Sequence, residues 1–187
     1  YSDYELRYEY DENGNNIHTI FSKNGQESHS WYKYDRKGNP IYRKSSFGSE
    51  TWYEYDKDGN QIYTEDSDGN KTWSMYNSKG QMIYYKTSSG YECWSEYDSR
   101  GNMVHESSSD GTEEWNKYDD KGQLIQRAKE YADGSWYTSW YEHDSNGKLT
   151  YSRDSDGHEE WNTYDKHGNA VRHILKNNDE RARVYVV

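Results

Sequence analysis

The chain has 187 residues, a formal net charge of −11 and a hydrophobic content of only 30%, and aromatic residues alone make up 17% of the sequence. This length is that of one ordinary domain. The excess of acidic residues argues against a nucleic-acid-binding surface, which needs clustered Lys and Arg, and favours a basic partner or simple solubility. No apolar run reaches the roughly 18 residues of a transmembrane helix, so the sequence predicts no membrane span.

The hydrophobic content is concentrated in the aromatic residues. Tyr occurs 22 times and Trp 8 times, whereas Phe occurs only twice. Such low apolarity would ordinarily indicate disorder, but the regular recurrence of the aromatic residues argues for an ordered chain. We therefore expect a thin core, one or two layers of β-sheet held together by ladders of aromatic side chains.

Tryptophan recurs at a fixed interval of 21 residues, with one longer step between the fifth and the sixth member of the series. A Tyr follows three residues behind each Trp, except in the sixth unit, where His143 takes its place. Self-similarity at a fixed short period is the signature of a repeat architecture. The series consists of Trp31, Trp52, Trp73, Trp94, Trp115, Trp140 and Trp161.

Two turn signals divide each unit, as residues 51–72 illustrate. Asp56–Gly59 is typical of a type I turn followed by a left-handed glycine, which closes a three-residue hairpin loop. Asp68-Gly69 is typical of a two-residue hairpin turn. The runs between them are rich in Tyr, Trp, Ile and Thr, which favour strands. The sequence therefore predicts an all-β fold of about sixteen short strands in tandem hairpin repeats, forming an elongated antiparallel meander sheet or an open β-spiral.

These loop lengths also predict the strand register. They place both Trp52 and Trp73 opposite Thr64, and directly paired residues share a face of the sheet. Ile62 is then predicted to lie on the same face. The opposite face is predicted to carry Tyr53, Tyr55 and Tyr63.

The first unit carries the motif R-Y-x-Y-D-x-x-G-N at residues 7–15. This motif resembles the YD repeat of RHS-type bacterial proteins, and the later W-x-x-Y-D-x-x-G-N units resemble a divergent variant with Trp in place of Arg. The resemblance extends over residues 6–171, so we expect a single repeat domain over residues 1–187 with a capping segment at residues 172–187. It implies a role in polymorphic-toxin systems, in which such repeats wrap a toxin or occur in surface proteins, and toxins have dedicated immunity proteins.

The sixth unit is longer than the others. His143 follows Tyr118 by 25 residues instead of 21, and the Asp133-Gly134 turn comes two residues late. Two extra residues on each arm would make this hairpin project about 7 Å beyond its neighbours. Aromatic residues in such a position are enriched at interaction hot spots, although they could instead cover an adjoining edge of the sheet. The aromatic residues of this hairpin are Tyr131, Trp136 and Tyr137.

Beyond Asn169 the period decays. Asn177–Asp179 is typical of a turn, and Arg181–Val187 is an apolar, basic segment typical of a closing strand. Because open sheet edges invite unwanted pairing, we expect this strand to cap the repeats.

The sequence offers no catalytic motif, and we expect no enzyme activity, cofactor or metal. His143 and His105 each occupy a Tyr position of the repeat, so they are interpreted as repeat substitutions. The Asp residues recur in turns, where they bind backbone amides. Asp56-x-Asp58 resembles part of a calcium loop but lacks the spacing to a bidentate Glu. Cys93 is the single cysteine, so no intrachain disulfide can form.

A ladder of Tyr residues, among them Tyr32, Tyr53 and Tyr141, is predicted on one face. Exposed rows of aromatic rings stack on sugars, so the ladder is compatible with carbohydrate binding. Long sheets of low apolarity also need stacked aromatic residues to hold together, and this structural role is the favoured interpretation.

Together these features predict a non-enzymatic protein-binding scaffold. The first hypothesis is an immunity-type inhibitor in a polymorphic toxin system, cytoplasmic, whose acidic and aromatic surface engages a basic toxin with help from the hairpin of Tyr131, Trp136 and Tyr137. The alternative is a segment of a larger RHS-like surface or shell protein, at the cell surface or secreted, that encloses cargo or contacts carbohydrate through Tyr32, Tyr53 and Tyr141.

Overall fold

The computed structural model describes residues 4–177 and 183–186, and within this part of the chain it contains seventeen β-strands and no helix. Residues 1–92 form one compact lobe, and residues 93–187 form a second lobe. The first lobe contains β1 (Tyr4–Tyr10), β2 (Asn16–Lys23), β3 (Gln26–Tyr34), β4 (Pro40–Ser45), β5 (Glu50–Tyr55), β6 (Gln61–Asp66), β7 (Lys71–Tyr76) and β8 (Met82–Thr87).

The second lobe contains all but the first residue of β9 (Glu92–Tyr97), followed by eight further strands. These are β10 (Met103–Ser108), β11 (Glu113–Tyr118), β12 (Leu124–Glu130), β13 (Trp136–His143), β14 (Leu149–Asp154), β15 (Glu159–Tyr164), β16 (Ala170–Lys176) and β17 (Arg183–Val186). The predicted closing strand is thus present as β17, while the predicted turn lies largely outside the described residues.

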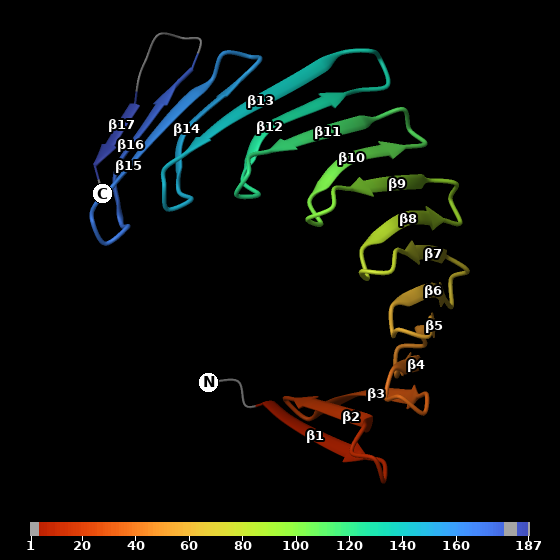
Figure 1. The fold of residues 1–187 in the computed structure, drawn as a ribbon. Helices are drawn as coiled ribbons and strands as arrows, with labels where there is room; N and C mark the ends of the chain where they lie inside the picture. Colours follow the sequence, from red (N-terminus) through yellow and green to blue (C-terminus); the bar gives the residue numbers. More distant parts are fainter. Residues whose placement is uncertain (1–3, 178–182, 187) are drawn as a thin grey trace. The chain divides into compact units, whose positions relative to one another are not determined.

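Within each lobe every strand pairs antiparallel with the next strand along the chain (Figure 1). The predicted all-β meander of tandem hairpins is therefore confirmed. The assignment of all 187 residues to a single repeat domain stays a prediction.

The second turn of the repeat differs from the prediction. The Asp66 amide donates to the Asn70 carbonyl at 3.0 Å, and the Gly69 amide donates to the Asp66 carbonyl at 3.0 Å, so the loop has three residues. A two-residue type I′ turn needs positive φ at both central residues, and of Asp68 and Gly69 only Gly69 has it (φ 83°). The Asp66 carboxylate instead binds the amides of Asp68 and Asn70, both at 2.9 Å, which favours the three-residue loop.

Among the described residues a two-residue turn occurs once, at Asn24-Gly25. Both residues have positive φ, 53° and 80°, and Lys23 pairs directly with Gln26. Asn tolerates the left-handed conformation better than most residues. This turn closes the longer β2–β3 hairpin of the first unit.

The first hairpin of each unit contains a β-bulge that the sequence prediction lacks. Tyr55 pairs with Gln61 but Glu54 pairs with Tyr63, so Ile62 is an extra residue. The same shift recurs beside the Tyr or His that ends the first strand of each unit. The extra residues are Ile17, Ile41, Ile62, Ile83, Val104, Ile125, Thr150 and Val171.

The bulge and the longer second loop correct the predicted register. Trp52 pairs with Glu65, and Trp73 pairs with Tyr63. The predicted column of Trp52, Thr64 and Trp73 is wrong, because a slip of one residue exchanges the two faces of a strand. Tyr63 lies on the Trp side, and Thr64 lies opposite Tyr53 on the other side.

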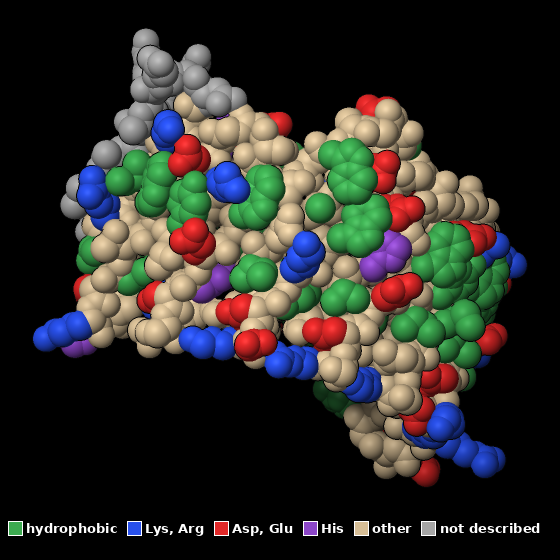
Figure 2. Space-filling view, turned by 45° about the horizontal axis from the view of Figure 1, so that its top comes forward, with side chains coloured by type: hydrophobic (Ala, Val, Ile, Leu, Met, Phe, Trp, Pro, Cys, Tyr) green, Lys and Arg blue, Asp and Glu red, His purple; other side chains and the backbone are tan. Residues whose placement is uncertain are grey.

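The two faces carry different side chains. We call the side with the repeated Trp the Trp face; it also carries Tyr63 and the ion pair of Lys71 with Glu65 at 3.2 Å. We call the opposite side, which carries Tyr32, Tyr53 and Tyr141, the Tyr face. No hydrophobic side chain is fully buried among the residues whose burial is described. Figure 2 shows hydrophobic side chains exposed at the surface beside acidic and basic ones.

Without a buried core, specific hydrogen bonds hold neighbouring hairpins together. The Tyr55 hydroxyl donates to the Pro40 carbonyl at 3.0 Å, and burial raises the pKa of this Tyr. Ser67 donates its amide to the Glu50 carbonyl at 2.8 Å, and its Oγ accepts from the Glu50 amide at 3.2 Å. The Tyr bond recurs in other units, with Tyr34, Tyr76, Tyr118 and Tyr164 as donors.

Candidate partner-binding site

The lengthened hairpin predicted in the sixth unit is formed by β12 and β13. Pairing continues through Glu130 and Trp136, and the Tyr131 amide donates to the Ser135 carbonyl at 2.9 Å. Glu130 lies beside Glu113, in the position that Ser67 holds beside Glu50 in a regular unit. The two added residues on each arm are therefore confirmed.

The three aromatic residues of this hairpin do not form one patch. Trp136 lies on the Trp face, 55% exposed, and its ring stacks on Trp115 with centroids 5.2 Å apart. Tyr131 is 41% exposed, with Lys129 Nζ 5.3 Å from its ring centroid. Tyr137 is the next residue along the strand after Trp136 and so lies on the opposite, Tyr face.

On the Tyr face Tyr137 joins a polar cluster. Its hydroxyl donates to Asp154 Oδ2 at 2.8 Å, and His158 Nδ1 lies 3.0 Å from the same oxygen. Asp154 Oδ1 accepts from the amides of Asp156 and His158, each at 3.0 Å. Burial opposes ionisation of Asp154, but these hydrogen bonds, led by that from Tyr137, hold its pKa below the usual value. The bond to Asp154 raises the pKa of Tyr137.

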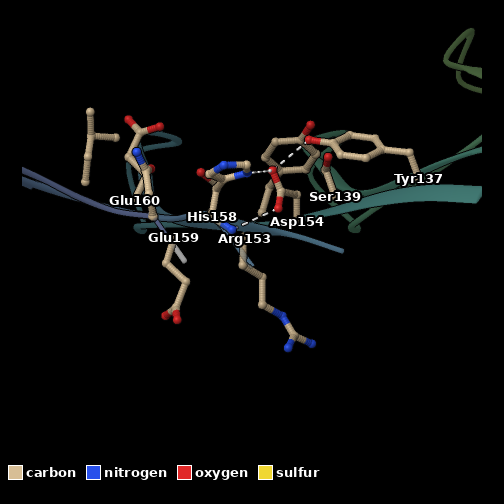
Figure 3. Close-up of a pocket in the computed structure, with 11 residues that line it drawn as sticks. Tyr137, Ser139, Arg153, Asp154, His158, Glu159 and Glu160 are labelled. Carbon is tan, nitrogen blue, oxygen red and sulfur yellow. Dashed lines mark hydrogen bonds and ion pairs between the residues drawn. The ribbon is translucent and has the colours of Figure 1, made fainter. Parts of the chain in front are cut away.

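This cluster lines a cavity of about 220 Å³. Ser139, only 8% exposed, is among its lining residues. Figure 3 shows Glu160, His158, Asp154 and Tyr137 on one side of the strands, with Glu159 and Arg153 pointing to the other. The complete lining is Tyr137, Ser139, Tyr141, Ser152, Arg153, Asp154, His158, Glu159, Glu160, Leu175 and Asn177.

Of the residues proposed from sequence, the cavity includes Tyr137 and Tyr141. Tyr32 and Tyr53 belong to the first lobe, where they pair with Arg43 and Thr64 on the Tyr face and are half-buried. Their role in partner binding stays a prediction.

Sequence reasoning missed Asp154, His158 and Glu160. Asp154 resembles every other turn Asp, so its sequence context carries no special signal. His158 does carry one, because it occupies the slot that Asn70 holds in a regular unit, where the Asn side chain donates to Asp66. Its Nδ1 makes the corresponding contact to Asp154.

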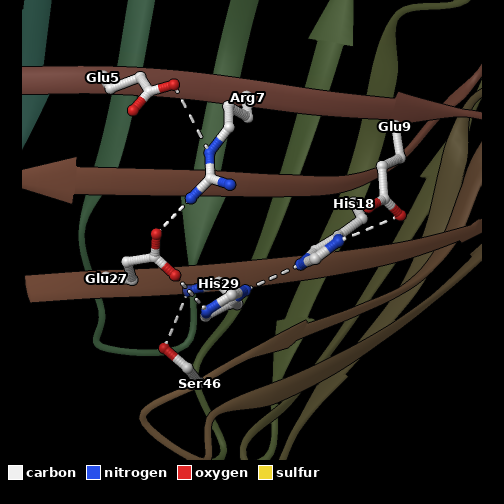
Figure 4. A network of polar contacts seen from close by, with 7 residues as sticks. All are labelled: Glu5, Arg7, Glu9, His18, Glu27, His29 and Ser46. Atoms are coloured by element: carbon white, nitrogen blue, oxygen red, sulfur yellow. Dashed lines mark hydrogen bonds and ion pairs between the residues drawn. The ribbon is translucent and has the colours of Figure 1, made fainter.

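A second polar cluster lies in the first lobe, on β1, β2 and β3 (Figure 4). His18 Nε2 lies 3.0 Å from His29 Nδ1, and both rings stack on Trp31. Glu9 lies 3.3 Å from His18, and Glu27 pairs with His29 at 3.7 Å and with Arg7. These contacts join the three strands, so we assign the cluster to the sheet itself.

The repeated turn carboxylates are likewise occupied by the fold. Asp56 accepts hydrogen bonds from the amides of Asp58 and Asn60 and from the Asn60 side chain, and the last of these is the main cause of its lowered pKa. Within residues 4–177 and 183–186, no three His, Cys, Asp or Glu side chains gather as a metal site. In the same part of the chain no helix of a length and apolarity suited to crossing a membrane is found.

No protein-family model and no curated protein matches this sequence. Three solved structures of toxin-complex proteins are similar in fold over 96% of this chain, which spans only 12% of theirs. They are TcdB2-TccC3 (14% identity, TM-score 0.68), TcdB2-TccC3-Cdc42 (15%, 0.59) and the Tc holotoxin pore of Photorhabdus luminescens (15%, 0.58). At these identities the likeness establishes a shared β-repeat fold.

Proposed function

We propose that this chain is a non-enzymatic, protein-binding β-repeat scaffold of a bacterial toxin system, forming part of the wall of a larger YD-repeat, RHS-like protein. The observation that carries the proposal is the likeness in fold to the toxin-complex structures, which covers 96% of this chain and 12% of those chains. The motif at residues 7–15 and its variants in later units support the same family.

The use of the repeated side chains supports a structural role for most of the chain. Asp56, Tyr55 and Ser67 each satisfy backbone groups of the same or the neighbouring hairpin. Such contacts keep successive strands in register, which is what a wall built of repeats requires. A scaffold of this kind performs no chemistry itself, and we propose that the chain is not an enzyme.

An immunity-type inhibitor is the second candidate. The net charge of −11 favours it, as does the acidic cavity beside the altered hairpin, because both suit a basic toxin. In this role the hairpin of Tyr131, Trp136 and Tyr137 would contact the toxin.

Capture of the native product from the source organism would separate these roles. Antibodies raised against this segment would recover the product, whose length is then measured by denaturing electrophoresis and peptide mapping. The wall role predicts a product much longer than 187 residues that shields a cargo from protease until the sheet is unfolded. Recovery of a product of this length alone, bound one-to-one to a basic protein, would favour the inhibitor. Recovery without any protein cargo or partner would refute both.

A further inference from the structure

The same three-residue motif, Glu-Trp-Asn, occurs in β11 and in β15. In both strands the Asn side-chain amide donates to Oε1 of the Glu two residues earlier, at 3.0 Å in β11 and 2.9 Å in β15. Since alternate residues share a face, Glu and Asn both lie on the Tyr face and the Trp between them does not. The two motifs are Glu114-Trp115-Asn116 and Glu160-Trp161-Asn162.

In β11 this motif holds an arginine of the chain itself. Arg127 pairs across the strands with Asn116. Its Nε lies 3.2 Å from Asn116 Oδ1 and 3.2 Å from Glu114 Oε1. The Glu–Asn pair therefore forms a receptor for a guanidinium group, and Arg127 fills it.

In β15 the cross-strand partner is a histidine. His173 pairs with Asn162, and its Nε2 lies 3.0 Å from Glu160 Oε1. His173 Nε2 and the side-chain amide of Asn162 both contact this one oxygen. Within the described part of the chain, Glu160 Oε2 accepts no hydrogen bond. The same holds for Glu114 Oε2 among the described residues, so the two receptors differ in the residue across from the Asn, which is an arginine in the first and a histidine in the second.

Glu160 is also a lining residue of the cavity beside Tyr137 and Asp154 in the second lobe. A volume of about 220 Å³ is below the roughly 300–1,000 Å³ of pockets for drug-sized ligands, so it suits the head of one side chain. On the side that holds Tyr137, the carboxylates of Glu160 and Asp154 face the cavity, while Arg153 points away (Figure 3). Tyr137 and Tyr141 contribute aromatic walls.

We propose that this cavity binds the guanidinium group of an arginine presented by a protein partner. Glu160 accepts the hydrogen bonds, and the rings of Tyr137 and Tyr141 pack against the planar group. Arginine fits better than lysine, because its guanidinium is planar, weakly hydrated, and stacks on aromatic faces while donating to a carboxylate. This inference rests on the proposed protein-binding function and names the chemistry of its partner.

The test is a titration of the ¹⁵N-labelled 187-residue chain with the peptide acetyl-Gly-Arg-Gly-amide, followed by amide chemical shifts. We expect saturable shifts confined to β13–β16. Glu160→Gln should raise the dissociation constant of the peptide about tenfold or more, because it removes the charge of the acceptor. His173→Arg should abolish binding while keeping Glu160, because the new side chain would fill the receptor as Arg127 does. Glu114→Gln is the matched control, and binding should be unchanged.

Three results would overturn the inference. One is equal binding of the peptide with citrulline, which is uncharged, in place of arginine. Another is unchanged affinity in both Glu160→Gln and His173→Arg, with spectra that show each variant folded. The third is a stronger response of the same amides to cellohexaose, which would make the cavity a carbohydrate site. If the peptide binds as expected but the native product carries no protein cargo or partner, the proposed function fails and the site stands.

Discussion

The hairpins β5–β8 and the region β12–β16 are built from the same repeat, but they use it differently. In β5–β8 the recurring residues are occupied by the sheet, as with Tyr55 on the Pro40 carbonyl and Asp56 on its own loop. In β12–β16 several slots are changed. His143 takes a Tyr slot and leaves its buried Nδ1 without a hydrogen-bond partner among the described residues, and His158 takes an Asn slot beside the cavity. Where the repeat is kept the side chains hold the sheet, and where it is changed one of them, His158, lines the cavity that we propose for binding.

Acid should have the largest effect, and it should act on the regular loops. Hydrogen bonds, chiefly from Asn60, hold the pKa of Asp56 below 3.8, and Asp66 behaves alike with Asn70. A carboxyl whose pKa is lowered by folding stabilises the fold fully above its unfolded pKa. This contribution is lost as the pH falls through 3.8 and then through the lower folded value. We expect a constant melting temperature from pH 7 to about 5 and a steep fall below about 4.

The loop at Asn77 provides a control for acid within the same region. Asn77 Oδ1 accepts from the Lys79 and Gln81 amides at 2.9 and 3.1 Å, and an amide does not titrate. Amide exchange at low pH should therefore accelerate at Asn60 well before it does at Gln81. Equal acceleration at both would show that the carboxylates are not the cause.

Removal of a Trp should separate the two regions next most clearly. Trp73 is half-buried and packs against Tyr63 with centroids 5.7 Å apart, so Trp73→Ala should cost about 2 kcal/mol of unfolding free energy. Trp136 is 55% exposed, so Trp136→Ala should cost less than about 1 kcal/mol. Urea unfolding measures both. A larger cost at Trp136 would place it among the residues that hold the sheet.

The hydrogen bond made by the repeated Tyr should contribute about 1 kcal/mol. Tyr55→Phe removes the bond to the Pro40 carbonyl and should lower stability by that amount. His143→Tyr should raise stability by a similar amount, because it replaces a buried nitrogen that lacks a hydrogen-bond partner within the described part of the chain. Thermal unfolding of the two variants checks this. Destabilisation by His143→Tyr would mean that the histidine has a local role of its own.

The smallest effect is expected at the cavity. Tyr137→Phe removes the hydrogen bond to Asp154 while the burial of Asp154 remains, so the pKa of Asp154 should rise. The stability cost should be at most about 1 kcal/mol. An NMR titration of the Asp154 carboxyl carbon measures the shift, with Tyr141→Phe as the control that leaves it unchanged. A pKa unaffected by Tyr137→Phe would remove Tyr137 from the cluster.

Features that depend on short stretches of chain could be predicted from the sequence. The loop at Asp56–Gly59, the strand-forming runs and the two residues added to each arm of β12–β13 follow from turn chemistry and the repeat period. The slots of His105 and His143 follow from the same period, and His105 indeed stacks on Trp115 as Tyr42 packs on Trp52.

Which residues face one another became clear only from the pairing of the strands in space. A single bulge at Ile62 and one more residue in the Asp66–Asn70 loop moved the partners of Trp52 and Trp73 by one position. Such a shift costs little locally, but side chains alternate across a strand, so it exchanges whole faces of the sheet. The meeting of Tyr137, Asp154 and Glu160 depends on the pairing of three strands. No period in the sequence encodes that meeting, because each of these residues belongs to a different strand.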